Sequence, residues 1–433
     1  MAIGVGVIFV LAITLAILGV PIALSFALGT IALMYMLNID PVWAFSTAFH
    51  QLHSFVFLAL PSYILLGQVV NRSGIAKELA SWFVSLTRVK GGLGAAAVLT
   101  NGVFGAMSGA SMPALAGVGA ALLPTMEEQG YPKSYSIGLL IPSATLSLMI
   151  PPSGGMILFG FMGMLPIATC FLAPFIPAVI IMCLLVITTL VRSQNIPSIS
   201  VPPKVDFKSY LRMVVKSTKR ALPGLLLPLI CLGGIYAGLY TPVEAAIMGV
   251  VYATLIGFFV YRGLNIKSYA NCLLKTAIIA GSIVTLMFVF TTLTKVLIVM
   301  QVTQTLLAVL MAISENLYVQ ILLINLLMIL MGMFMDDSSA IITSAIILLP
   351  VARALGVDPY HMAAMTSVNM AIGIITPPVG ALLYLGGHLA QLPLNEYGKN
   401  VAIFVSCAMV PGLLLTMYVP WLSTYLPHLF MGQ

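Results

Sequence analysis

The feature of this sequence that most limits its fold is a succession of uncharged apolar stretches, each long enough to cross a lipid bilayer. A membrane-spanning helix needs roughly 20 apolar residues. Because only 7% of the residues are charged and 61% are hydrophobic, the chain cannot cover a soluble domain with a water-facing surface. The sequence therefore predicts an all-α integral membrane protein and excludes soluble enzymes, nucleic-acid-binding proteins and disordered scaffolds. The predicted spans lie near residues 3–20, 22–38, 54–71, 134–160, 166–191, 222–240, 243–261, 276–300, 360–386 and 400–420.

Two further apolar stretches do not fit a single crossing. Residues 93–124 contain no charge over 32 residues, and a helix that rises about 1.5 Å per residue would then be much longer than a bilayer core of about 30 Å. Residues 317–350 carry Asp336 and Asp337 near their middle, where lipid would not tolerate them. We expect both stretches to be re-entrant hairpins that enter and leave on one side.

The distribution of positive charge supports this topology. With the N-terminus outside and each hairpin counted as no crossing, 16 of the 18 Lys and Arg residues fall on the cytoplasmic side, as the positive-inside rule requires. Lys295 and Arg353 are the exceptions. The basic, proline-containing segment 193–221 is the longest polar connector and separates the chain into residues 1–192 and 222–433.

The two halves are related by an internal repeat. A shift of 226 residues superposes Leu122-Leu123-Pro124 on Leu348-Leu349-Pro350 and Pro151-Pro152 on Pro377-Pro378, and several glycines also coincide. Each half then holds five spans and one hairpin, and its interrupted helix lies at 134–160 or 360–386. An odd number of crossings inverts the second copy in the membrane, which is the arrangement typical of secondary transporters.

The hairpin tips and the Pro-Pro breaks are the places where backbone oxygens become free. The first tip, residues 105–113, consists of small residues and hydroxyls followed by a proline. Such a tip can replace the hydration shell of a small cation, and half-helix N-termini attract a carboxylate. Small residues also allow close helix packing, and prolines can merely bend a helix, so these alternatives stay open. The polar residues around the breaks are Ser143, Thr145, Ser147, Ser153, Asn369 and Thr376.

No nucleotide-binding, zinc-protease or serine-hydrolase motif occurs in the sequence, and the five cysteines have no metal-ligand spacing. We therefore expect no cofactor and no catalysis, with transport driven by an ion gradient. The available hydroxyl, carbonyl and single carboxylate groups suit sodium as the coupling ion better than protons, because no chain of His and acidic residues crosses the membrane to relay protons. An intramembrane enzyme that uses Asp336 and Asp337 as an acid pair is the alternative from another class.

The sequence also resembles a known family. Residues 105–124, 142–160, 332–336, 241–246 and 369–380 are similar to the large membrane subunit of tripartite ATP-independent periplasmic (TRAP) transporters. The resemblance implies an elevator-type importer of organic acids in the bacterial inner membrane, coupled to sodium. Its implied partners are a periplasmic substrate-binding protein and a separate small four-span membrane subunit.

Matching the family's motifs to this chain assigns the sodium-binding residues. They are Ser108, Gly109, Ser111 and Pro151 in the first half, and Gly332, Asp336, Thr376 and Pro377 in the second. The substrate-binding residues are then expected to be Ser143, Thr145, Ser147, Ser153 and Asn369. The chain departs from the family at Asp337, where Thr is common, and at Gly154-Gly155.

A C4-dicarboxylate, a sialic acid and other sugar acids remain open as substrates, and a stand-alone sodium/dicarboxylate symporter remains open as the mechanism.

Overall fold

The structure, a computed structural model, describes residues 14–15, 19–201 and 206–431, and every regular element in those ranges is a helix. This confirms the all-α class. Seven helical segments in the described ranges are long and apolar enough to cross a membrane, but two of them, Leu317–Phe334 and Asp337–Ala354, are the arms of the second predicted hairpin. Five of the ten predicted spans therefore correspond to such segments. The difference arises partly because two of the predicted spans form helices of only 15 residues, α2 (Ile22–Met36) and α4 (Ala59–Ser73). The predicted span 3–20 and part of the segment 193–221 lie outside the described residues.

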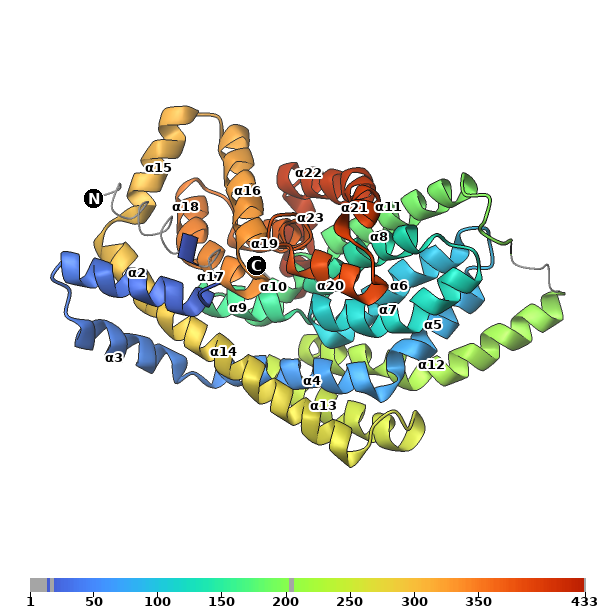
Figure 1. Cartoon of the computed structure of the whole chain (residues 1–433). Coiled ribbons are helices and arrows are strands. Elements are labelled where there is room, and N and C mark those ends of the chain that lie inside the picture. Colours follow the sequence, from blue (N-terminus) through green and yellow to red (C-terminus); the bar gives the residue numbers. More distant parts are fainter. Residues whose placement is uncertain (1–13, 16–18, 202–205, 432–433) are drawn as a thin grey trace.

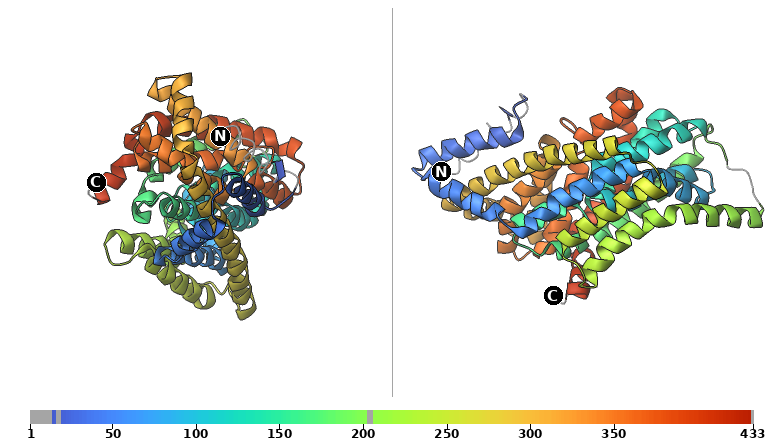
Figure 2. Two further views of the ribbon diagram at one scale, coloured as in Figure 1. Left: turned by 90° about the vertical axis from the view of Figure 1, so that its left-hand side faces the viewer. Right: turned by 90° about the horizontal axis from the view of Figure 1, so that it is seen from below.

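One layer of the molecule is built mainly from the first helices of each half (Figure 1). Within this layer α14 packs on α2, α3 and α4, while α13 packs on α4 and α12. Viewed from below, these helices lie side by side (Figure 2, right). The layer contains α2, α3 (Pro41–Leu52), α4, α12 (Phe207–Tyr236), α13 (Pro242–Leu255) and α14 (Ile266–Val299).

The second layer contains both predicted hairpins and both interrupted helices. Helix α5 (Ile75–Leu86) contacts α12 as well as α6 and α7, so it connects the two layers. From the first half come α6 (Gly92–Ser108), α7 (Ser111–Glu128), α8 (Lys133–Ala144), α9 (Gly154–Met162), α10 (Ile167–Leu172) and α11 (Phe175–Gln194). From the second half come α16 (Leu317–Phe334), α17 (Asp337–Thr343), α18 (Leu349–Ala354), α19 (Pro359–Gly373), α20 (Ala381–Ala390), α21 (Leu394–Phe404) and α22 (Val410–Tyr418).

Two helices continue beyond the boundaries predicted for their spans. The sequence predicts a span over 276–300, but α14 runs unbroken from Ile266 to Val299. At 1.5 Å per residue it is about 50 Å long, so it extends beyond a bilayer core of about 30 Å. Helix α12 likewise begins at Phe207, within the predicted linker. Asn265 starts α14 with a capping box that it forms with Ser268, which explains why the helix begins there.

Shorter elements complete the chain. A 3₁₀ turn (Phe55–Leu58) precedes α4, α15 (Val302–Ile313) joins α14 to α16, and α23 (Trp421–Met431) ends the described chain. Thr241 and Glu244 form a capping box at the start of α13, which explains why the helix begins there.

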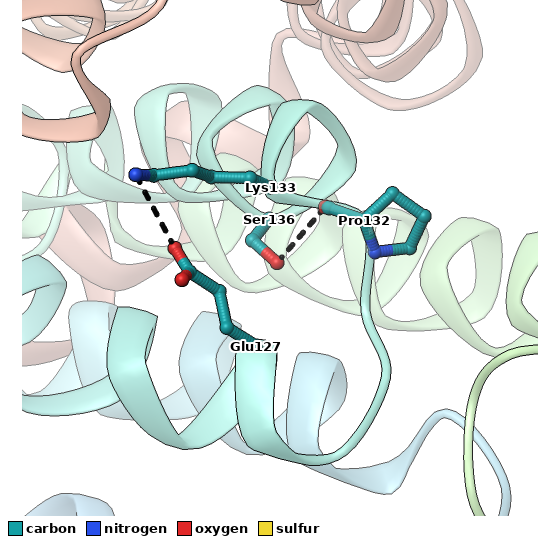
Figure 3. Close-up of polar contacts among 4 residues, drawn as sticks. All are labelled: Glu127, Pro132, Lys133 and Ser136. Carbon is teal, nitrogen blue, oxygen red and sulfur yellow. Dashed lines mark hydrogen bonds and ion pairs between the residues drawn. The ribbon is translucent and has the colours of Figure 1, made fainter.

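The turn between α7 and α8 is tied together at the surface. Lys133 Nζ lies 3.7 Å from Glu127 Oε1, and the Ser136 hydroxyl donates to the Pro132 carbonyl at 3.3 Å (Figure 3). Both charged side chains are partly exposed, so this pair contributes at most about 1 kcal/mol. It orders the connection that leads from the first helix pair into the interrupted helix.

Candidate functional site

The first helix pair turns back inside the protein, at residues 109–110. Gly109 ends α6 with φ 60°, a left-handed conformation that glycine adopts at little cost, and Ala110 is extended before α7 begins at Ser111. Ser108 and Ser111 are both buried. The hydroxyl of Ser111 has no hydrogen-bond partner. A buried hydroxyl without a partner is costly, which makes Ser111 a candidate ligand for a bound ion or molecule.

This tip lies against the break in the interrupted helix of the same half. The break follows a 3₁₀ turn, Thr145–Leu148, and includes the cis peptide between Pro151 and Pro152. The N–H of Gly154, at the start of α9, donates to the Gly109 carbonyl at 3.0 Å. A Cβ on Gly109 would lie 2.8 Å from the Pro152 carbonyl oxygen. The structure therefore brings the backbone of the tip at Gly109 against Pro152 and Gly154 of the break.

The second helix pair turns at residues 335–336 and is capped by an acidic side chain. Met335 is extended, and Asp336 is the N-cap residue of α17. Its carboxylate accepts hydrogen bonds from the Ser339 N–H at 3.2 Å and from the Ser339 hydroxyl. Asp337 accepts from the N–H of Ser338 at 2.9 Å. Because both acids lie at a helix N-terminus, the helix dipole stabilises their negative charge.

The second tip also contacts the break of its own half. The N–H of Val379 donates to the Met333 carbonyl at 3.2 Å, close to the cis peptide between Pro377 and Pro378. A Cβ on Gly332 would lie 2.9 Å from the Cα of Gly373. Two glycines therefore allow α16 and α19 to touch through their backbones. The hydroxyl of Thr376 donates to the Ile372 carbonyl at 2.7 Å.

The two halves meet at the breaks through a shared carbonyl. Leu148, at the end of the first 3₁₀ turn, accepts a hydrogen bond from the Ser153 hydroxyl at 2.7 Å and another from the Ser367 hydroxyl at 2.8 Å. Ser367 belongs to α19, the interrupted helix of the other half. This buried contact holds the break of the first interrupted helix against the regular part of α19.

A matching pair of amide contacts fixes each interrupted helix to its neighbour. Asn101 on α6 donates to the Ser143 hydroxyl at 2.8 Å, and Asn369 on α19 donates to the Asn325 side-chain oxygen at 2.6 Å. Ser143 and Asn369 are separated by the 226-residue shift of the repeat. Sequence reasoning named these two residues but missed Asn101 and Asn325. The separation of this second pair is two residues shorter than the 226-residue shift.

A cavity of about 540 Å³ lies between the two layers. The first tip and the start of α9 line it from one layer, together with Asp337 and Ser338 at the start of α17, and α4 and α14 line it from the other. Figure 1 shows α6, α7 and α9 above α4 and α14 at this position. The polar and charged residues of the lining are Tyr63, Gln68, Asn71, Ser108, Ser111, Lys275, Asp337 and Ser338.

The sequence-predicted residues divide into two groups. Ser108, Gly109 and Ser111 line the cavity, whereas the predicted Pro151, Gly332, Asp336, Thr376 and Pro377 lie at the tips and breaks outside its lining. The five predicted substrate-binding residues are fully buried and also lie outside the lining. The hydroxyls of Ser143, Thr145, Ser147 and Ser153 donate to carbonyls three to five positions earlier. Their contact with substrate stays a prediction.

Sequence reasoning missed the wall of the cavity that α4 and α14 form. No local sign of a site marks these helices, because Tyr63 and Asn71 are single polar residues in the predicted span 54–71 and Lys275 directly precedes the span 276–300. Only the packing of one layer on the other brings them opposite the first tip. A spacing of four residues between Tyr63, Gly67 and Asn71 is the one signal that places them on a common helix face.

Broken helices that meet beside a cavity between two layers of membrane helices define a secondary transporter. The chain belongs to the tripartite ATP-independent periplasmic transporter family, and residues 9–422 match the model of its DctM component. This confirms the resemblance stated above.

Relatives of known name match the chain over nearly its whole length. It is 31% identical over 443 residues to the C4-dicarboxylate TRAP transporter large permease protein DctM of Rhodobacter capsulatus, with 98% of each chain covered. It is 29% identical to the sialic acid TRAP transporter large permease protein SiaM of Vibrio cholerae, with 96% of each covered. The crystal structure of the Alcanivorax borkumensis YdaH transporter has the same fold, with a TM-score of 0.61 and 15% identity over 89% of each chain.

Proposed function

We propose that this chain imports an organic acid across the bacterial inner membrane in symport with sodium. The observation that carries the proposal is the convergence of two helix N-termini, those of α7 at Ser111 and of α9 at Gly154, on one cavity beside the first tip. The Gly154 N–H already donates to the Gly109 carbonyl, but the remaining first-turn N–H groups and the helix dipole make such N-termini favourable for a carboxylate. The names of the relatives support a C4-dicarboxylate or a sialic acid as the substrate.

Sodium is proposed to bind where each tip meets its break. In the first half the ligands are Ser108, Gly109 and Ser111, with the break at Pro151. The unpartnered Ser111 hydroxyl and the closeness of Gly109 to the Pro152 carbonyl support this assignment. These are hard oxygen donors of the kind that a small cation accepts in place of water. The described residues hold no cluster of His, Cys, Asp and Glu that would suit a transition metal.

In the second half the proposed sodium ligands are Gly332 and Asp336 at the tip, with Thr376 and Pro377 at the break. Contact between the backbones of Gly332 and Gly373 supports this pairing of tip and break. The Asp336 carboxylate supplies a negative charge that would balance the ion. Because the two sites lie in different halves, one sodium ion in each would hold both tips closed around the substrate.

The transport step is proposed to be an elevator movement. The layer with the tips would carry the cavity past α4 and α14, which stay fixed in the membrane. The outward surface of the fixed layer is strongly apolar, with Phe259, Leu229 and Ile278 each more than half exposed. This surface suits lipid or the small four-span membrane subunit. A periplasmic binding protein is proposed to deliver the substrate.

Uptake into proteoliposomes tests the proposal. The chain is reconstituted with a radiolabelled C4-dicarboxylate or sialic acid outside, with or without a sodium gradient, and with or without a small four-span TRAP membrane subunit and a periplasmic binding protein. The proposal expects uptake that requires sodium and the binding protein together. Uptake at the same rate with and without a sodium gradient would refute sodium coupling. Uptake without a binding protein would favour a stand-alone symporter.

A further inference from the structure

The cavity between the layers has charged groups on both walls. Its 24 lining residues include one acid, Asp337, and one basic residue, Lys275. Asp337 belongs to the layer with the tips, whereas Lys275 belongs to α14 in the other layer. An anionic substrate in this cavity therefore has one side chain of opposite charge available to it among the lining residues.

The position of Lys275 is set by the packing of α14 on α4. One turn earlier, the Cys272 thiol lies 3.5 Å from the Gln68 carbonyl of α4. Lys275, Ile279 and Ile283 follow at intervals of four, so they share the helix face that lines the cavity. By the distribution of positive charges, Lys275 lies at the cytoplasmic end of this face.

Lys275 is free to bind a ligand. Its side chain is exposed, and it forms no ion pair with any residue in the described part of the chain. A positive group that lines a cavity without an internal partner can neutralise a carboxylate that enters. A lysine whose only role is to extend its ammonium group to the membrane–water interface would not need to line the cavity.

The neighbouring helix α4 adds polar groups to the same wall. Tyr63 lines the cavity and is buried, but its hydroxyl is covered by protein and has no hydrogen-bond partner, so it adds no polar group to the cavity surface. Gly67, one turn later, lies so close to the first tip that its Cβ would be 2.6 Å from the Ser108 carbonyl oxygen. Asn71, another turn on, also lines the cavity. The wall formed by Tyr63, Asn71 and Lys275 thus faces the first tip.

We infer that Lys275, supported by Asn71, is the charge-selecting part of the substrate site and binds a carboxylate of the organic acid from the fixed layer. This inference rests on the proposed function and deepens it. The moving layer contributes helix N-termini and the sodium ligands. The fixed wall contributes the positive charge, and it does so where the cavity faces the cytoplasm.

Binding measurements on the full chain in detergent test this inference. Succinate and N-acetylneuraminate are titrated by calorimetry at fixed sodium into the wild type and into three variants, Lys275→Met, Lys275→Arg and Lys267→Met. Sodium binding is titrated separately. Lys267 is the matched control, because it is exposed on the same helix but does not line the cavity.

Lys275→Met is expected to raise the dissociation constant of the acid that the wild type binds by about five- to tenfold. Lys275→Arg is expected to restore most of the affinity, and Lys267→Met and all sodium titrations to stay unchanged. Equal affinity in Lys275→Met overturns the inference alone. A joint loss of acid and sodium binding that Lys275→Arg does not rescue also overturns it, because that indicates a structural role. A wild type that binds neither acid removes the proposed function as well.

Discussion

Replacing Asp336 with asparagine separates the structural role of this residue from its proposed role as a sodium ligand. Asp and Asn are about equally good at the N-cap position of a helix. The aspartate accepts two hydrogen bonds from Ser339, through different carboxylate oxygens. Asparagine has one acceptor oxygen, so one of these bonds is lost, at a cost of about 1 kcal/mol in the free energy of unfolding.

The cost for sodium binding is larger, because the charge itself disappears. Two unit charges about 4 Å apart attract by about 4 kcal/mol at an effective dielectric constant of about 20. Part of this attraction offsets the desolvation of the carboxylate, which leaves a net loss of about 1.5–3 kcal/mol. Since about 1.4 kcal/mol corresponds to a factor of ten, the sodium concentration for half-maximal uptake should rise about 10- to 100-fold.

Initial rates of substrate uptake into proteoliposomes, measured over a range of external sodium concentrations, give this half-maximal value. Glu244→Gln is the matched control, since it removes an acid from the capping box of α13, outside both tips. The control should keep the wild-type sodium dependence. If Asp336→Asn folds, transports and shows the same half-maximal sodium concentration as the wild type, Asp336 is not a sodium ligand.

Two further predictions concern the tips. Replacing Ser108 and Ser111 together with alanine should raise the sodium concentration for half-maximal uptake by about tenfold, because two proposed oxygen ligands are lost; a change in maximal rate alone would contradict their role. Gly373→Ala should lower the free energy of unfolding by about 1–3 kcal/mol, since its Cβ would lie 2.6 Å from the Cα of Gly332. Gly281→Ala, with open space around the new Cβ, is the control in a thermal melt and should be neutral or slightly stabilising; equal effects would show that the close contact of α16 and α19 is unimportant.

The sequence predicted the helical class and the places where helices break, because these depend on local chemistry. Pro151-Pro152 and Pro377-Pro378 cannot continue a regular helix, and Gly109 supplies the left-handed residue at which α6 ends. The repeat then related the two tips to each other. Such features are properties of short segments, so they are visible before any tertiary contact is known.

The polar groups around the breaks were harder to assign from sequence. Ser143, Thr145 and Ser147 were expected to face a substrate, but each hydroxyl donates to a carbonyl three positions earlier. Ser and Thr in helices commonly form such local bonds. Sequence shows that a hydroxyl is present, but not whether the backbone already uses it.

Neighbouring residues at one helix start also separate in a way that sequence does not reveal. Asp336 turns back to cap α17 and lies outside the cavity lining, whereas Asp337 lines the cavity. With 3.6 residues per turn, adjacent positions point about 100° apart, so one step decides which wall each side chain reaches. Tyr63, Asn71 and Lys275 likewise needed the packing of the two layers to become part of a site.

The two tips are proposed to open to opposite sides of the membrane in turn, and thiol labelling measures this most directly. Single cysteines are introduced at 108, 111, 336 and 339 in a chain whose five native cysteines are replaced, because Cys183 and Cys407 are exposed and would react. Membrane-impermeant reagents are applied from either side, with sodium, with sodium and substrate, or with neither.

The account predicts that sodium and substrate change which compartment reaches these positions. Positions 108 and 111 should lose access from one side as they gain it from the other. Labelling of all four positions from one and the same side under every condition would contradict alternating access and, with it, the proposed transport mechanism.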